Sequence, residues 1–165
     1  MAALEVGKTA PSFTLPLMSG GELSLSDALR RGPVVLAFFK ISCPVCQFSF
    51  PYLERLYQAT KGKHVTILGI SQNTAADTAA FTRQYGITFP IAIDDESRYT
   101  VSNAYGLTNV PTVFFIAEDG EIEISSVGWS RPDLERIAQK IAESARLGKI
   151  EVIRAGEDVP AFKAG

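Results

Sequence analysis

The fold is decided by the stretch VVLAFFKISCPVC, residues 34–46. Its first six residues are apolar without a break and follow Gly32-Pro33, which is typical of a strand buried on both faces of a sheet. Cys43 and Cys46, the only two cysteines of the chain, come directly after this strand. Apolar residues then recur at helical spacing up to Gly62. This order predicts a buried strand that leads into a helix, with the cysteine pair at the start of the helix.

Strand and helix patterns alternate along the rest of the chain, which predicts an α/β fold with a mixed sheet. A Gly-Gly turn between two alternating segments predicts an N-terminal hairpin, and Asp119-Gly120 predicts a second tight turn. We expect one domain over residues 1–147 and a C-terminal extension over 148–165. The expected hairpin strands are 13–17 and 22–25, the other strands 64–70, 89–93, 110–116 and 121–127, and the helices 26–31, 74–85, 95–105 and 130–147.

Composition excludes several classes of partner. The 165 residues carry a formal net charge of −2, so no bulk positive charge favours nucleic acid or an anionic membrane. The longest apolar run, residues 34–39, is far shorter than the ~20 residues of a membrane span. The N-terminal residues show neither a basic segment nor a long apolar one, so we expect a cytoplasmic protein unless a leader has been removed.

The C-x-x-C spacing favours a redox couple over a structural bridge or a metal site. A disulfide between Cys43 and Cys46 would close almost no loop and would add little stability. Zinc needs two further ligands, and His64 is the only histidine, so we expect no metal site. The acidic run 94–96 is interpreted as a turn and the first turn of the helix 95–105, where acids favour the helix dipole.

With this pair on a strand–helix unit, the chain resembles the thioredoxin-like superfamily, and most closely its TlpA/ResA-type and redoxin (AhpC/TSA-like) branch. The resemblance implies a thioredoxin-like fold, with helices on both faces of a central mixed sheet. It covers most of the chain, from about Val6 to Leu147. The matching segments are APSFTLP at 10–16, FFKISCPVC at 38–46, FPYL at 50–53, VPTVFFI at 110–116 and EDGEI at 118–122.

The position of the cysteines at the start of a helix explains why thiol–disulfide exchange uses the C-x-x-C spacing. A cysteine in the first turn faces unpaired N–H groups and the positive end of the helix dipole, which favour a thiolate. Cys43 is therefore the expected nucleophile, and Cys46, one turn deeper, would attack the mixed disulfide and release the reduced partner. The resemblance implies that Pro111 follows a cis peptide bond and shapes the partner groove. The residues expected to contact the partner are Pro44, Val45, Val110 and Thr112.

The chain departs from the family pattern around the cysteines. Ser42 replaces a tryptophan that often precedes the first cysteine, Ala37 replaces a buried acid of thioredoxin, and Ser49 replaces a glutamate of some ResA-type proteins. Neither familiar proton acceptor for Cys46 is thus present. Lys40 and Ser42 are the candidates for tuning the reactivity of Cys43.

We predict a thiol-disulfide oxidoreductase that exchanges the Cys43–Cys46 pair with a protein or small-molecule disulfide, without a cofactor and with a separate electron donor. One alternative is a peroxiredoxin-like thiol peroxidase, with Cys43 as the peroxidatic and Cys46 as the resolving thiol. The Pro-x-x-x-Thr/Ser-x-x-Cys pattern of peroxiredoxins fits neither cysteine, because Leu36 and Lys40 stand at those positions before Cys43. A second alternative is a binding or redox-sensing module of thioredoxin fold.

Overall fold

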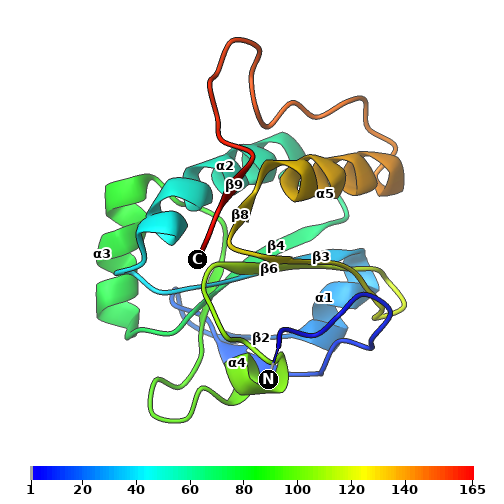
Figure 1. Cartoon of the computed structure of the whole chain (residues 1–165). Helices are drawn as coiled ribbons and strands as arrows, with labels where there is room; N and C mark the ends of the chain where they lie inside the picture. The colour runs from blue at the N-terminus through cyan, green and yellow to red at the C-terminus, as the bar shows by residue number, and fades with distance from the viewer. Residues whose placement is uncertain (1) are drawn as a thin grey trace.

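Strand β3 (Val34–Phe39) lies at the centre of the protein in the computed structural model, which describes residues 2–165. It belongs to a five-stranded sheet of order β5-β4-β3-β6-β7 (Figure 1). β3 runs parallel to β4 and antiparallel to β6, so the sheet is mixed as predicted. The other strands of this sheet are β4 (Thr66–Ser71), β5 (Ile91–Ile93), β6 (Thr112–Ile116) and β7 (Ile122–Val127).

The apolar run of β3 exists because both faces of the sheet are covered. Val35, Ala37 and Phe39 point into one core, which the helices α2 (Pro44–Thr60), α3 (Ala75–Tyr85) and α5 (Arg131–Ser144) help to form. Val34, Leu36 and Phe38 point into a second core with α1 (Leu25–Arg31), α4 (Thr100–Ala104) and the N-terminal hairpin. All six side chains of β3 are fully buried.

The N-terminal hairpin is confirmed. Its strands β1 (Thr14–Pro16) and β2 (Glu22–Ser24) pair antiparallel around the Gly-Gly turn. The buried side chain of Leu15 joins the second core, and a bridge between Leu17 and Ala92 ties the hairpin to the edge of the main sheet. The hairpin is thus part of the domain.

The predicted helix over 95–105 is wrong in its first half, because only Thr100–Ala104 is helical. Asp94 is buried, and its carboxylate accepts hydrogen bonds from the N–H of Ser102 at 2.8 Å, the hydroxyl of Ser102 at 2.8 Å and the N–H of Val101 at 3.3 Å. The carboxylate therefore satisfies the free donors at the start of α4 from outside that helix. Residues 95–99 form the turns that connect Asp94 with α4.

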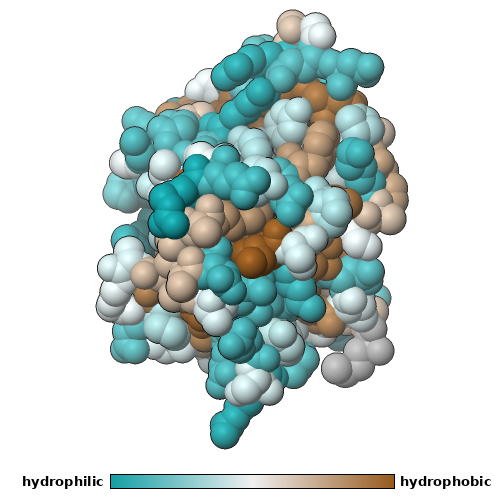
Figure 2. Space-filling view, turned by 90° about the vertical axis from the view of Figure 1, so that its left-hand side faces the viewer, coloured by the Kyte–Doolittle hydropathy of each residue, from teal (hydrophilic) through white to brown (hydrophobic). Residues whose placement is uncertain are grey.

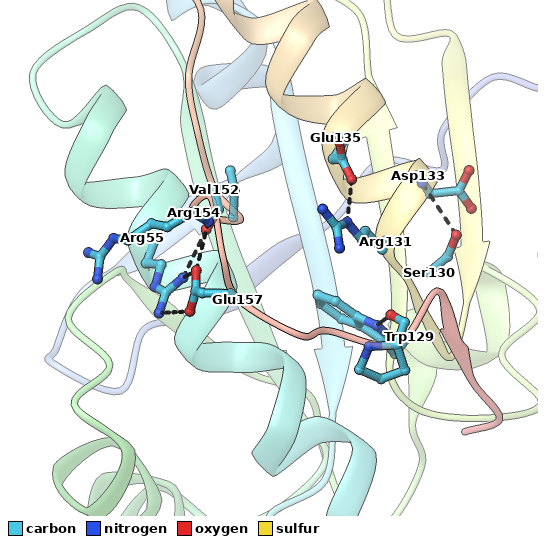
Figure 3. A network of polar contacts seen from close by, with 10 residues as sticks. Arg55, Trp129, Ser130, Arg131, Asp133, Glu135, Val152, Arg154 and Glu157 are labelled. Atoms are coloured by element: carbon cyan, nitrogen blue, oxygen red, sulfur yellow. Dashed lines mark hydrogen bonds and ion pairs between the residues drawn. The ribbon is translucent and has the colours of Figure 1, made fainter.

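Residues 148–165 leave the end of α5, pass above α2 and end beside β8 (Figure 1), and Figure 3 shows polar contacts that attach them to the domain. Val152 and Val159 are buried, and the Arg55 guanidinium of α2 binds both carboxylate oxygens of Glu157 at 2.7 and 2.9 Å. The segment then forms β9 (Phe162–Lys163), which pairs antiparallel with β8 (Trp129–Ser130). Sequence reasoning predicted neither β8 nor β9, and α5 ends at Ser144, three residues before its predicted end.

The surface beside α3 is largely hydrophilic, with a few hydrophobic residues exposed near its middle (Figure 2). Within residues 2–165, none of the helices combines the length and apolarity that crossing a bilayer requires.

Candidate active site

Cys43 occupies the N-cap position of α2, directly beyond the end of β3. Its sulfur accepts a hydrogen bond from the N–H of Cys46 at 3.1 Å, in the way that an oxygen of a capping side chain would. Pro44 takes the first helical position, where a backbone N–H would have no partner. The Cys43 side chain is half-buried, so its sulfur is held by the helix end and is still open to a groove.

Cys46 lies one turn further along α2 in a different environment. Its side chain is fully buried in the core between α2 and the sheet. Burial raises the pKa of the Cys46 thiol well above its ordinary value, and the contact with Cys43 raises that pKa further. Both thiols are free, so the pair is in its reduced state. The arrangement gives one accessible sulfur and one sulfur that the core keeps protonated.

The loop that delivers Cys43 is fixed by side chains from its surroundings. The N–H of Ile41 donates to the side-chain oxygen of Asn73 at 3.0 Å, and the amide of Gln47 donates to the carbonyl of Ile41 at 2.9 Å. The N–H of Cys43 donates to the carbonyl of Lys40 at 3.3 Å. These bonds leave the backbone before the cysteine little freedom, so the sulfur has a defined position.

The second wall of the site is the loop before β6. The Val110–Pro111 peptide bond is cis, as the resemblance implied. The Cys43 thiol donates to the carbonyl of Val110 at 3.4 Å, which brings two segments 67 residues apart into contact. Thr112 is buried and donates its hydroxyl to the carbonyl of Asn109 at 2.8 Å. Thr112 therefore stabilises the loop and, contrary to expectation, is not exposed to a partner.

A groove of about 440 Å³ opens beside Cys43 between these walls. Among the predicted residues, Lys40, Cys43 and Val110 line it. The residues of the lining that sequence reasoning missed are Gln72, Tyr99, Ser102, Asn103, Leu107, Thr108, Asn109 and Gly165.

Two of the missed residues, Gln72 and Ser102, have a clear structural explanation. Gln72 donates its side-chain amide to the hydroxyl of Ser102 at 2.9 Å, and Ser102 in turn donates to Asp94 at 2.8 Å. This buried polar chain connects the groove with the start of α4. No motif marks it in the sequence, because the three residues belong to different segments and meet only in the folded chain.

The remaining predicted residues lie around the sulfur without lining the groove. Pro44 and Ser42 are exposed, Val45 is half-buried, and Pro111 is buried behind Val110. The Lys40 ammonium lies 5.7 Å from the centre of the Tyr99 ring, across the same groove. Within residues 2–165, no set of three or more His, Cys, Asp or Glu side chains is placed to hold a metal ion. The peroxidase and binding-module alternatives and the cytoplasmic location stay predictions.

Comparison with known proteins finds one matching family model and similar sequences. The AhpC/TSA family model matches residues 6–125. The thiol-disulfide oxidoreductase ResA of Geobacillus kaustophilus is 36% identical over 141 residues, which cover 84% of this chain and 79% of ResA. ResA of Bacillus anthracis is 32% identical over 140 residues, with the same coverage of 84% and 79%.

A solved structure shows the same fold. The thioredoxin domain of a thiol-disulfide oxidoreductase from Bacteroides vulgatus superposes with a TM-score of 0.74 at 24% identity. The match covers 84% of this chain and 98% of that domain. The central sheet with helices on both faces is thus a thioredoxin-like fold, as the sequence predicted.

Proposed function

The chain belongs to the AhpC/TSA family and to its ResA-type branch of thiol-disulfide oxidoreductases, and from this premise we propose that Cys43 attacks the partner disulfide and Cys46 releases the product. The observation that carries the assignment is the contrast between the two sulfurs. Cys43 is open to the groove and accepts an N–H hydrogen bond, whereas Cys46 is fully buried behind it. The accessible sulfur reacts first.

The proposed reaction has two exchange steps. The Cys43 thiolate attacks one sulfur of the partner disulfide, a Cys43–partner disulfide forms, and the other partner sulfur leaves as a thiolate. The Cys46 thiolate then attacks the Cys43 sulfur, the Cys43–Cys46 disulfide forms, and the second partner sulfur leaves. Two electrons pass from the dithiol to the partner, and two protons move from the cysteines to the released thiols. The reverse sequence oxidises a partner dithiol.

The backbone at the site has a role in both steps. The N–H of Cys46 donates to the Cys43 sulfur and favours negative charge there, both before attack and when this sulfur is the leaving group. The carbonyl of Val110 faces the same sulfur, and we propose that a partner backbone pairs with it. Partner binding by Val110, Pro44 and Val45 is part of the proposal.

Lys40 is proposed to support the anionic sulfur through the groove that they share. Its ammonium is held near the Tyr99 ring, and both residues line the groove with Cys43. Replacing Lys40 by Gln should slow attack on a disulfide several-fold, on the order of the loss of one nearby charge, and Lys40→Arg should restore much of the rate. Equal rates for all three proteins would remove Lys40 from the mechanism.

A pair of matched variants tests the assignment. Reduced wild-type protein, Cys43→Ser and Cys46→Ser are each mixed with oxidised glutathione, and products are followed by mass spectrometry. Cys43→Ser should lose exchange, by a factor on the order of 10³ or more, because its remaining thiol is buried. Cys46→Ser should stop as a Cys43–glutathione mixed disulfide. A stable adduct on Cys46 in the Cys43→Ser variant would reverse the two roles.

A further inference from the structure

The segment 161–165 lies against the active site although it is far from the cysteines in sequence. Its strand β9 pairs with β8, and the N–H of Arg131 donates to the carbonyl of Ala161 at 2.9 Å. In Figure 1 the red segment descends beside β8 towards the start of α2. Gly165 then lines the same groove as Cys43.

The backbone of this segment fits closely between two loops. A methyl group added at Gly165 would lie 2.5 Å from the carbonyl oxygen of Val110, the oxygen that contacts the Cys43 sulfur at 3.4 Å. One added at Gly128 would lie 2.5 Å from the carbonyl oxygen of Lys163 and 3.0 Å from the nitrogen of Gly165. The side-chain amide of Asn109 donates to the carbonyl of Gly165 at 3.3 Å. An extended backbone therefore fills the space between Val110 and Gly128.

From these contacts we propose that residues 161–165 occupy the partner groove beside Val110 and compete there with an incoming partner strand. This inference rests on the proposed function and adds to it a segment of the chain itself that controls access to Cys43. The contacts to the segment come from the backbone of β8, from the side-chain amide of Asn109 and from the Phe48 ring, whose centre lies 4.9 Å from the Lys163 ammonium. Pairing with β8 and the bond from Asn109 recognise a strand by its main chain. A partner strand reaches Cys43 only after residues 161–165 have moved.

The last residues of the segment, 161–165 (the tip), can move while the residues up to Pro160 (the base) stay fixed. Val159 is buried, and the indole N–H of Trp129 donates to the carbonyl of Pro160 at 2.7 Å. Beyond this point every residue is exposed, with Phe162 at 62% exposure. The pairing of β8 with β9 covers only two residues on each side. Displacing the tip therefore breaks few contacts and leaves the base in place.

Two glycines of residues 148–165 provide a matched test in the full chain. Gly165→Leu places a side chain where the carbonyl of Val110 lies, whereas Gly148→Leu adds the same atoms in open space. Each protein is reacted with two compounds that release 5-thio-2-nitrobenzoate: the mixed disulfide of free cysteine, and that of a cysteine within an unstructured nine-residue peptide. The attacked bond and the leaving group are identical, so only the peptide backbone differs.

We expect Gly165→Leu to raise the ratio of the peptide rate to the cysteine rate by about tenfold, because the competing segment no longer holds the site. Gly148→Leu should keep the wild-type ratio. A synthetic peptide of sequence AFKAG, residues 161–165, should then inhibit the peptide reaction of Gly165→Leu. Lys163→Pro, which lacks the N–H of the β9 residue paired with Trp129, should raise the ratio as Gly165→Leu does.

The outcomes separate the inference from the proposed function. An unchanged ratio of the peptide rate to the cysteine rate in both Gly165→Leu and Lys163→Pro would overturn the proposal that residues 161–165 compete for the groove. An equal acceleration with both compounds would mean that the segment only shields the sulfur, which overturns the proposed competition with a partner strand. Failure of the wild-type protein to release thionitrobenzoate from the cysteine compound would instead contradict the proposed exchange reaction.

Discussion

The first turn of α2 and the segment 148–165 meet at one groove, but they are held there by opposite means. Cys43 and Cys46 are positioned by the end of β3, by an N-cap and by one helical turn. Residues 148–165 are positioned by contacts from distant parts of the chain, such as Arg55 with Glu157. The difference separates two properties: local backbone geometry sets the chemistry of the sulfurs, and a long-range attachment sets access to them.

The pH dependence of the second exchange step, in which Cys46 attacks, is the strongest test of how the local geometry sets the chemistry of the two sulfurs. Because burial raises the pKa of Cys46, only a small fraction of this thiol is ionised near neutral pH. Only the thiolate attacks, so release should speed up about tenfold for each unit between pH 7 and pH 9. The measurement is stopped-flow absorbance of the thionitrobenzoate that Cys46 releases from a Cys43 mixed disulfide.

Cys46→Ser is the control for this step and should hold the mixed disulfide without release. A rate that does not change over the two pH units would contradict the prediction. It would mean that a group near Cys46 accepts its proton, although the buried hydroxyl of Ser49 donates to the carbonyl of Cys46 at 3.4 Å. Residues 148–165 should not affect this pH dependence.

A smaller effect is expected on stability. The folded pKa of Cys46 lies above its ordinary value of 9.0, so above that pH the unfolded chain loses a proton that the folded chain keeps. The contribution of Cys46 to stability is therefore complete below pH 9 and is lost as the pH rises. Relative to Cys46→Ala, the free energy of unfolding of the reduced protein should fall by about 1 kcal/mol from pH 9 to pH 10.

Urea unfolding of both proteins under reducing conditions measures this difference. The buried Tyr105, whose pKa is also raised by burial, is present in both proteins and cancels in the comparison. Parallel pH profiles for the two proteins would show that Cys46 is more solvated than its burial indicates, and would weaken the contrast between the two sulfurs.

The same contrast explains what sequence reasoning could reach. β3, the start of α2 and the hairpin follow from patterns within a few residues, and each was predicted close to its observed bounds. The start of α4 was misplaced because the carboxylate of Asp94 caps it from seven to eight residues away. An acidic residue ahead of a helix pattern does not tell which later turn it caps.

The groove was predicted only in part, through Lys40, Cys43 and Val110, for a similar reason. Gln72, Asn109 and Gly165 enter it through contacts that span 30 to 56 residues, as in the bonds of Gln72 to Ser102 and of Asn109 to Gly165. Glycines 128 and 165 do mark a close approach of two backbones, but only the folded chain shows which segments approach. Contacts between residues so far apart in the chain create no repeating residue pattern that could be recognised in the sequence.

The smallest expected effect concerns the attachment itself. The Arg55 guanidinium and the N–H of Arg154 hold the pKa of Glu157 down to about 2. At a pH above the ordinary pKa of a glutamate, this carboxylate therefore stabilises the docked segment. The contribution is lost as the pH falls towards 2. Glu157→Gln should speed hydrogen exchange of residues 150–160 several-fold at pH 6 and lower the melting temperature by only about a degree, because the pair is partly exposed.

Glu135→Gln removes the same charge from an exposed pair with Arg131 and is the matched control. If residues 150–160 exchange equally slowly in wild-type protein and in Glu157→Gln, buried Val152 and Val159 hold the segment without the ion pair. The attachment would then be an apolar contact that does not weaken as the pH falls.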